Sequence, residues 1–64
     1  MKFKLEIECD NDAFGLGASD TVAEVQRILG AAITKLEGYQ LEAVLRDCNG
    51  NRVGEYKLTG KRNR

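Results

Sequence analysis

Histidine, proline and tryptophan are absent from this 64-residue chain, and it holds only two cysteines. Without histidine the chain lacks the commonest metal ligand and the usual acid–base catalyst near neutral pH, which excludes Ser-His and Cys-His sites, HExxH metalloproteases and zinc fingers. A chain of about 60 residues also buries too little surface for both a core and a shielded catalytic pocket. We therefore expect one small domain that is not an enzyme and holds no metal or cofactor.

Net charge and long apolar segments are lacking as well. Ten basic residues balance ten acidic ones, which argues against a protein whose main role is to neutralise a phosphate backbone. No apolar run approaches the roughly 18 residues that a membrane helix needs, and the charged residues within 1–8 do not resemble a secretory signal. We expect a cytoplasmic protein in which Cys9 and Cys48 remain thiols.

The first third of the chain predicts a strand and a loop. Residues 1–9 alternate between apolar and charged side chains, the pattern of a half-buried strand. Residues 10–20 are rich in Asp, Asn and Gly, which is typical of a loop. We expect this loop to place Phe14 and Leu16 against the core.

Residues 21–37 predict a helix, because apolar residues recur there at three- and four-residue spacing. Thr21 and Glu24 fit a capping box at its start, and Gly38 suits a left-handed residue at its end. Gly30 lies inside the helix, either at a close approach to another element or as a tolerated exposed glycine.

Two further alternating segments, 40–47 and 53–59, flank Asn49-Gly50 and predict a β-hairpin. A two-residue loop would pair positions that sum to 99, placing Ala43 opposite Tyr56 and Leu41 opposite Leu58. A three-residue loop would pair apolar with polar positions, so the pattern favours loops of two or four residues.

The order strand, helix, hairpin indicates an α+β fold of β-α-β-β type over residues 1–59, followed by a disordered basic tail at 60–64. A right-handed crossover leaves room for the last strand in the middle, giving an antiparallel sheet of order 1-3-2 with the helix on its apolar face. Charge favours Glu6 opposite Lys57 rather than opposite Glu55. The other face should be polar and include Val53. The small core and the two edge strands leave both a homodimer and a monomer open.

Acidic residues gather early in the chain, and this cluster is the first candidate binding surface. Its members are Glu6, Glu8, Asp10, Asp12 and Asp20. They suit a surface that mimics phosphates or fills a basic groove on a partner protein, although a simply solvated loop is the alternative. Asp10-Asn11-Asp12 lacks the remaining ligands of a calcium loop, and Cys48 lacks a neighbouring base, so neither predicts a metal or catalytic site.

Basic residues gather late in the chain and form the alternative candidate, a nucleic-acid surface, for which a simply solvated tail is the other explanation. They are Arg46, Arg52, Lys57, Lys61, Arg62 and Arg64. Only Tyr56 is interleaved with them, and its position in the alternation assigns it to the core, so there is no aromatic platform for bases.

The string LRDCNGNRVGEYKL, the helix residues Glu24, Val25, Ile28 and Leu29, and the opening KFKLEIECDNDAF together resemble small, largely uncharacterised phage and prophage proteins. The resemblance covers almost the whole chain but carries no site residues over. It implies a small accessory protein in the bacterial host cytosol that binds, and in some cases inhibits, a host protein or complex such as a defence system. Nucleic-acid binding through the basic hairpin and tail is the alternative function.

Overall fold

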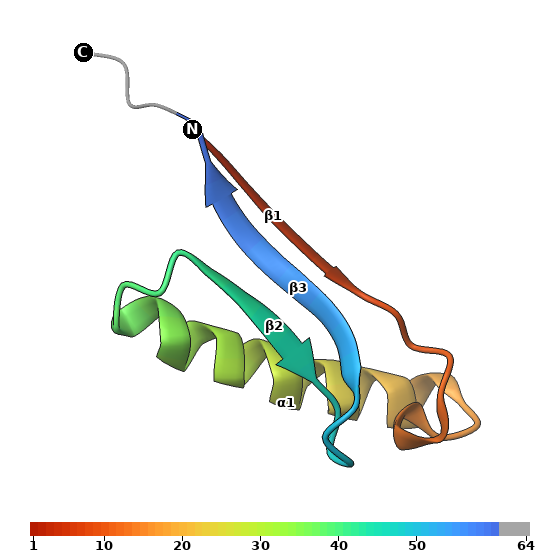
Figure 1. The fold of residues 1–64 in the computed structure, drawn as a ribbon. Helices are drawn as coiled ribbons and strands as arrows, with labels where there is room; N and C mark the ends of the chain where they lie inside the picture. The colour runs from red at the N-terminus through yellow and green to blue at the C-terminus, as the bar shows by residue number, and fades with distance from the viewer. Residues whose placement is uncertain (61–64) are drawn as a thin grey trace.

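The computed structural model describes residues 1–60 and confirms the α+β fold (Figure 1). Strand β1 (Lys2–Ile7) leads through a short 3-10 helix η1 (Asp12–Phe14) into helix α1 (Ala18–Glu37), and strands β2 (Glu42–Arg46) and β3 (Arg52–Thr59) follow. The three strands form one antiparallel sheet in the order β1-β3-β2, as predicted. Most of the predicted tail, residues 61–64, lies outside the described residues.

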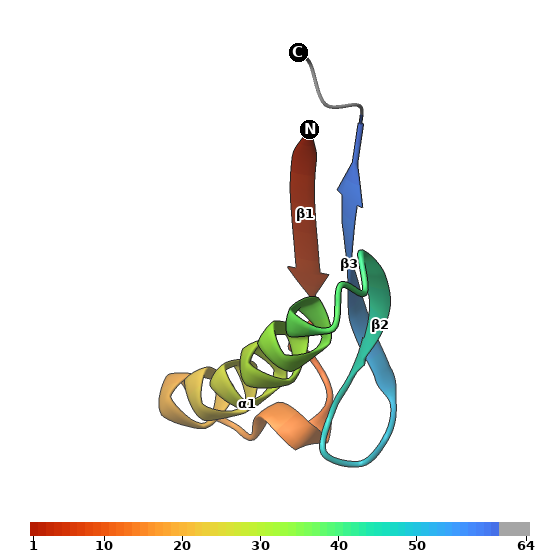
Figure 2. The same cartoon turned by 90° about the vertical axis from the view of Figure 1, so that its left-hand side faces the viewer.

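The core lies between α1 and one face of the sheet, near the end where η1 and the hairpin meet (Figure 2). It consists of Phe14, Ile28, Ala32, Leu45, Val53 and Tyr56. The Tyr56 hydroxyl donates a hydrogen bond to the carbonyl oxygen of Gln40 (2.7 Å), so the polar end of this buried ring is satisfied. The far halves of β1 and β3 extend beyond α1 (Figures 1 and 2).

Because of that overhang, the helix covers less of the sheet than the apolar pattern predicts. Phe3 and Leu41, expected beneath the helix, are exposed. On α1 itself, Val22, Leu29 and Ile33 are also exposed, so the buried face of the helix is narrower than its apolar spacing predicts. Helical spacing marks an apolar face, but it does not say how much of that face the rest of the chain can reach.

The start of α1 differs from the prediction. The helix begins at Ala18 behind Gly17, which supplies no side-chain cap. The Thr21 hydroxyl instead donates to the carbonyl oxygens of Phe14 and Gly17 (both 3.1 Å), which ties the helix to the preceding loop. The capping box is therefore wrong. The loop also separates its two apolar residues, since Phe14 is buried and Leu16 is fully exposed.

The end of α1 lies where expected, but the left-handed residue is not the glycine. Gly38 has φ −87°, and Tyr39 takes φ 63° instead. Within the helix, a Cβ at Gly30 would meet nothing within 4 Å, so Gly30 is the tolerated exposed glycine rather than a close approach.

The β2–β3 hairpin has the predicted register over most of its length, but its loop has a different length from the one predicted. Ala43 pairs with Tyr56 and Leu45 with Gly54, as expected, but the register shifts between Leu45 and Arg46. Arg46 then pairs with Arg52, and three residues, 48–50, form the loop. A three-residue loop is compatible with the apolar pattern because a β-bulge absorbs one residue.

Val53 is that extra residue, since β3 runs Gly54, Val53, Arg52 opposite the consecutive Leu45 and Arg46. A bulged residue leaves the strict alternation of the strand. Val53 is therefore buried in the core rather than on the polar face where alternation placed it. The remaining residues predicted for that face are exposed.

The register of β1 on β3 is also corrected. Leu5 pairs with Tyr56 and Glu6 with Glu55, rather than Leu5 with Leu58 and Glu6 with Lys57. The cause lies at Gly54, where a Cβ would lie only 1.9 Å from the carbonyl oxygen of Glu6. An exposed like-charge pair costs about 0.2–1 kcal/mol, which is too little to move β1 away from the one residue of β3 that admits such a close approach.

Two glycine-to-alanine substitutions test this reading of the backbone. Gly54→Ala should destabilise the fold by about 3 kcal/mol, because the new methyl group collides with the main chain of β1. Gly30→Ala, the matched control in open space, should stabilise by about 0.5–1 kcal/mol. Urea unfolding followed by circular dichroism measures both. Equal effects of the two substitutions would contradict the close approach at Gly54.

Candidate functional site

Asp47 joins the hairpin tip to the loop after β1. Its buried carboxylate accepts hydrogen bonds from the amides of Asn49 and Asn51 (both 2.9 Å) within the hairpin. It also accepts one from the Asn11 side chain (2.7 Å), which comes from the loop before η1. The side-chain oxygen of Asn11 accepts in turn from the amide of Ala13 (3.0 Å), so the same residue caps η1.

Glu24 makes a second link, from α1 to the same hairpin. Its buried carboxylate accepts from the Arg27 guanidinium at two positions (3.0 and 2.8 Å) and from the amide of Cys48 (2.8 Å). Arg27 also donates to the carbonyl oxygen of Arg46 (3.1 Å). Helix, hairpin and loop are thus fixed to one another by two carboxylates, and a buried carboxylate is stable only when its acceptors are used in this way.

These contacts shift the titration of both groups. The hydrogen bond from Arg27 lowers the pKa of Glu24 below 4.5, aided by the Cys48 amide and opposed by burial. Burial raises the pKa of Asp47, but the hydrogen bonds from Asn51, Asn11 and Asn49 outweigh it, so its pKa falls below 3.8. The pKa of Arg27 rises because Glu24 accepts its hydrogen bonds. Both carboxylates are therefore charged in the folded protein near neutral pH, and each is already fully engaged.

Sequence reasoning missed this network. Nothing in the pattern marks Glu24 and Asp47 as buried, because charged residues usually face solvent. The sequence did contain one signal of the turn that Asp47 begins. Asp at the first position and Gly at the fourth position are typical of type I turns. Asp47 and Gly50 occupy those positions, and the amide of Gly50 donates to the Asp47 carbonyl oxygen (3.0 Å).

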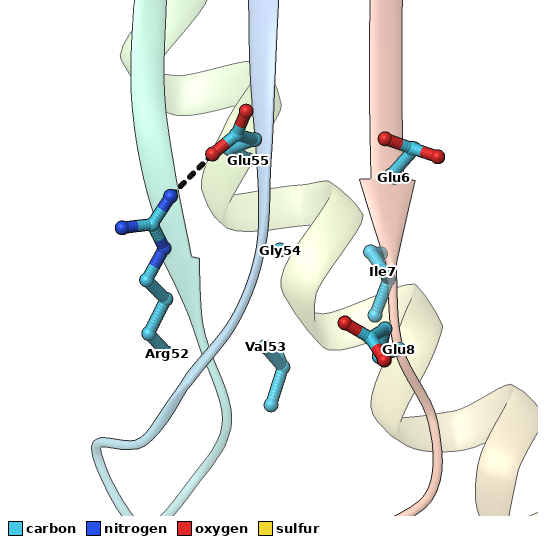
Figure 3. A pocket seen from close by; sticks show the side chains of 7 residues that line it. All are labelled: Glu6, Ile7, Glu8, Arg52, Val53, Gly54 and Glu55. Atoms are coloured by element: carbon cyan, nitrogen blue, oxygen red, sulfur yellow. Dashed lines mark hydrogen bonds and ion pairs between the residues drawn. The ribbon is translucent and has the colours of Figure 1, made fainter.

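A shallow hollow of about 660 Å³ lies beside Gly54 (Figure 3). Glu6 reaches it from β1 and Glu8 from the residue just after β1, while Arg52 and Glu55 reach it from β3. Arg52 forms an ion pair with Glu55. Three carboxylates around one guanidinium leave the hollow electronegative, and it is open to solvent.

The predicted acidic residues all lie at the surface, in two groups. Glu6 and Glu8 lie on the polar face of the sheet, whereas Asp10, Asp12 and Asp20 lie in and after the loop around η1. All five are exposed. Within residues 1–60, none of the five forms an ion pair.

The predicted basic residues that the structure describes differ from the acidic ones, because they contact acceptors of their own chain. Arg46 donates to the carbonyl oxygen of Gly50 (3.1 Å), Arg52 pairs with Glu55, and Lys57 pairs with Glu42 (3.7 Å). The other three, Lys61, Arg62 and Arg64, lie outside the described residues. Each described member of this set thus already contacts an acceptor of its own chain.

The part of the chain that the structure describes holds neither a cluster of metal ligands nor a disulfide. Over residues 1–60, no three His, Cys, Asp or Glu side chains come together in a way that could hold an ion. Asn11, within the segment that resembles a calcium loop, serves as a helix cap instead. Cys9 and Cys48 are both free. None of the helices in this range has the length and apolar composition needed to cross a membrane.

Comparison with known protein families, curated proteins and solved structures finds no match to the chain.

The two lowered pKa values predict how stability depends on pH. A carboxyl group whose pKa is lower in the folded than in the unfolded protein stabilises the fold above its unfolded pKa, and this contribution disappears as pH falls through the folded pKa. The free energy of unfolding should therefore decrease as pH falls below about 4.5, the ordinary pKa of Glu24.

Asp47→Asn and Glu24→Gln should each have a lower free energy of unfolding than the wild type at pH 7. In both variants this free energy should fall less steeply below about pH 4.5 than it does in the wild type. Thermal unfolding across a pH series measures this. Glu37→Gln, which alters an exposed carboxylate at the end of α1, is the control and should keep the wild-type slope. A wild-type slope in both Asp47→Asn and Glu24→Gln would contradict the assigned role of the network.

Proposed function

We propose that this protein is a non-enzymatic binding module of a phage or other mobile element that attaches to a protein of the bacterial host in the cytosol. The observation that carries the proposal is the contrast between its charges. The exposed acidic residues Asp10, Asp12 and Asp20 form no ion pair within residues 1–60, whereas each described basic residue of the alternative surface contacts an acceptor of its own chain.

The loop residues carry this function better than the sheet residues do. Along residues 2–8, Lys2 and Lys4 are followed by Glu6 and Glu8, so the charge there is of both signs. Around η1 the charge has one sign, because no basic residue occurs between Lys4 and Arg27. A surface of one sign raises the rate of encounter with a partner of opposite sign.

The loop is also held in place, which favours binding. Asn11 lies between Asp10 and Asp12 and donates to the buried Asp47, while Thr21 fastens the start of α1 to Phe14. A fixed loop loses little conformational freedom when it binds. The partner that fits is a protein with a basic groove, such as a nucleic-acid-binding component of a host defence complex, which this surface would block.

The alternative, a nucleic-acid-binding protein, has less support. Its described residues, Arg46, Arg52 and Lys57, would first have to leave acceptors of their own chain, and Tyr56 is buried. No aromatic platform for bases therefore lies among the described residues of this surface.

The test is an affinity capture from lysates of several bacterial hosts, with the wild type and Asp10→Asn/Asp12→Asn/Asp20→Asn. We expect a stoichiometric, salt-sensitive protein partner whose affinity for the triple variant is at least about 10-fold weaker. The charge-matched control Glu37→Gln/Glu42→Gln/Glu55→Gln should retain the partner.

Two outcomes would overturn the proposal. One is the absence of any stoichiometric partner across hosts and salt concentrations. The other is a mobility shift of DNA or RNA at low salt that weakens when the chain is shortened after Thr59, which would favour the nucleic-acid alternative.

A further inference from the structure

Strand β1 has an unpaired edge. Sheet order places it beside β3 only, and among residues 1–60 no strand lies on its other side (Figure 2). The amide of Glu8, just after β1, donates to the carbonyl oxygen of Val53 on β3 (2.7 Å). Because peptide groups of alternate residues point to the same side of a strand, those of Phe3, Leu5 and Ile7 point away from β3. The edge therefore offers a row of donors and acceptors to a further strand.

This edge lacks the backbone features that usually prevent pairing. Edge strands are commonly protected by charged side chains, lysine above all, or blocked by proline, by a bulge or by being very short, and β1 has only the charges. β1 has six residues, no proline and an unbroken register with β3. The opposite edge, β2, has five residues and a register shift at Arg46.

The charges of β1 are poorly matched by its own chain. On the polar face Lys4 lies opposite Lys57, and Glu6 lies opposite Glu55. Like charges in directly opposed positions destabilise a sheet. Yet along the strand the charges have a simple order, with lysines at positions 2 and 4 and glutamates at positions 6 and 8.

We propose that β1 pairs antiparallel with β1 of a second copy of this chain, about a two-fold axis at Leu5, so that two sheets join into one of six strands. On the polar face this pairing sets Lys2 against Glu8 and Lys4 against Glu6 of the second copy. On the apolar face it sets Phe3 against Ile7 and Leu5 against itself. The inference goes beyond the proposed function and does not depend on it.

The charge order selects this register over its neighbours. A shift of two residues in one direction opposes Lys4 to Lys4, and in the other direction Glu6 to Glu6. A shift of one residue sets apolar positions against charged ones and misaligns the outward-facing peptide groups. Parallel pairing opposes like charges throughout. Only the two-fold at Leu5 gives every charged residue from 2 to 8 an opposite charge.

The apolar face of β1 supports the same partner. Phe3 is 46% exposed and Met1 is 68% exposed, because α1 does not reach them. The pairing brings Ile7 and the half-buried Cys9 of the second copy beside these two residues. Apolar surface that one chain leaves in water is thereby covered by the other.

The edge strand β2 is the competing site for a second copy. Its terminal residues Glu42 and Arg46 are also opposite in charge, but both are already engaged, Glu42 with Lys57 and Arg46 with Gly50. The gain from opposite charges is therefore smaller there, and β2 offers a shorter edge of five residues.

The proposal is tested by reversing either the two positive or the two negative charges of residues 2–8. Lys2→Glu/Lys4→Glu makes the strand wholly acidic, and Glu6→Lys/Glu8→Lys makes it wholly basic. Each turns four attractive cross-strand pairs of the dimer into repulsive ones, so self-association should weaken at least about 100-fold. Neither should harm folding, because the acidic side chain introduced at position 4 would face Lys57 and the basic one introduced at position 6 would face Glu55.

Sedimentation equilibrium and light scattering after size exclusion measure the oligomeric state, and circular dichroism checks the fold. We expect a wild-type dimer, two monomeric variants, and a one-to-one heterodimer when the two variants are mixed. Recovery on mixing is a readout that general destabilisation would not produce. The loop variant Asp10→Asn/Asp12→Asn/Asp20→Asn should remain dimeric, so this test and that of the proposed function fail independently.

Three results would overturn the proposal. They are a wild type that stays monomeric up to about 1 mM, a Lys2→Glu/Lys4→Glu variant that stays dimeric, and a mixture of the two variants that forms no heterodimer. The control Glu42→Lys should leave the dimer intact. Its conversion to a monomer would move the interface to β2 and would equally overturn the assignment to β1.

Discussion

The contact between Gly54 and the carbonyl oxygen of Glu6 is the constraint on which the arrangement of the sheet depends. Gly54 lies on the central strand and pairs with Ile7 on one side and Leu45 on the other. No side chain is tolerated there, so β1 has one position in which its backbone comes this close. Two residues further on, Tyr56 then lies between Leu5 and Ala43, and the buried ring of the core is placed. The opposed like charges on the outer face follow from the same register.

The constraint also explains which features could be predicted from the sequence. The alternation in β1, the periodicity of α1 and the Asn49-Gly50 turn are local signals, and they were sufficient for the elements and the sheet order. The register of β1 was not predictable from charge, since exposed pairs contribute little compared with a backbone collision. The bulge at Val53 and the burial of Asp47 and Glu24 depend on contacts between distant segments. Alternation and charge, read one segment at a time, assign such residues to the surface.

The carboxylates of Asp47 and Glu24 hold the segments of this small protein together in addition to its apolar core. Among residues 1–60, six apolar residues are buried, and they lie at one end of the sheet. At that end Asp47 fastens the loop through Asn11, and Glu24 fastens the hairpin through Cys48. Satisfied polar networks of this kind favour one arrangement over others, because each lost partner leaves a buried charge unmatched. The loop that carries Asp10 and Asp12 is consequently held by hydrogen bonds and not by apolar packing alone.

Although the net charge is zero, the charged residues form three groups with different roles. The basic residues of the hairpin are engaged within the chain, the aspartates around η1 are not, and β1 carries lysines in one half and glutamates in the other. A strand ordered in this way is complementary to itself, whereas a loop of one sign is complementary only to something basic. A two-fold axis at Leu5 would set the two acidic loops at opposite ends of the paired strands. One dimer would then present two identical binding surfaces, and a partner with repeated basic sites would be held far more tightly than by either surface alone.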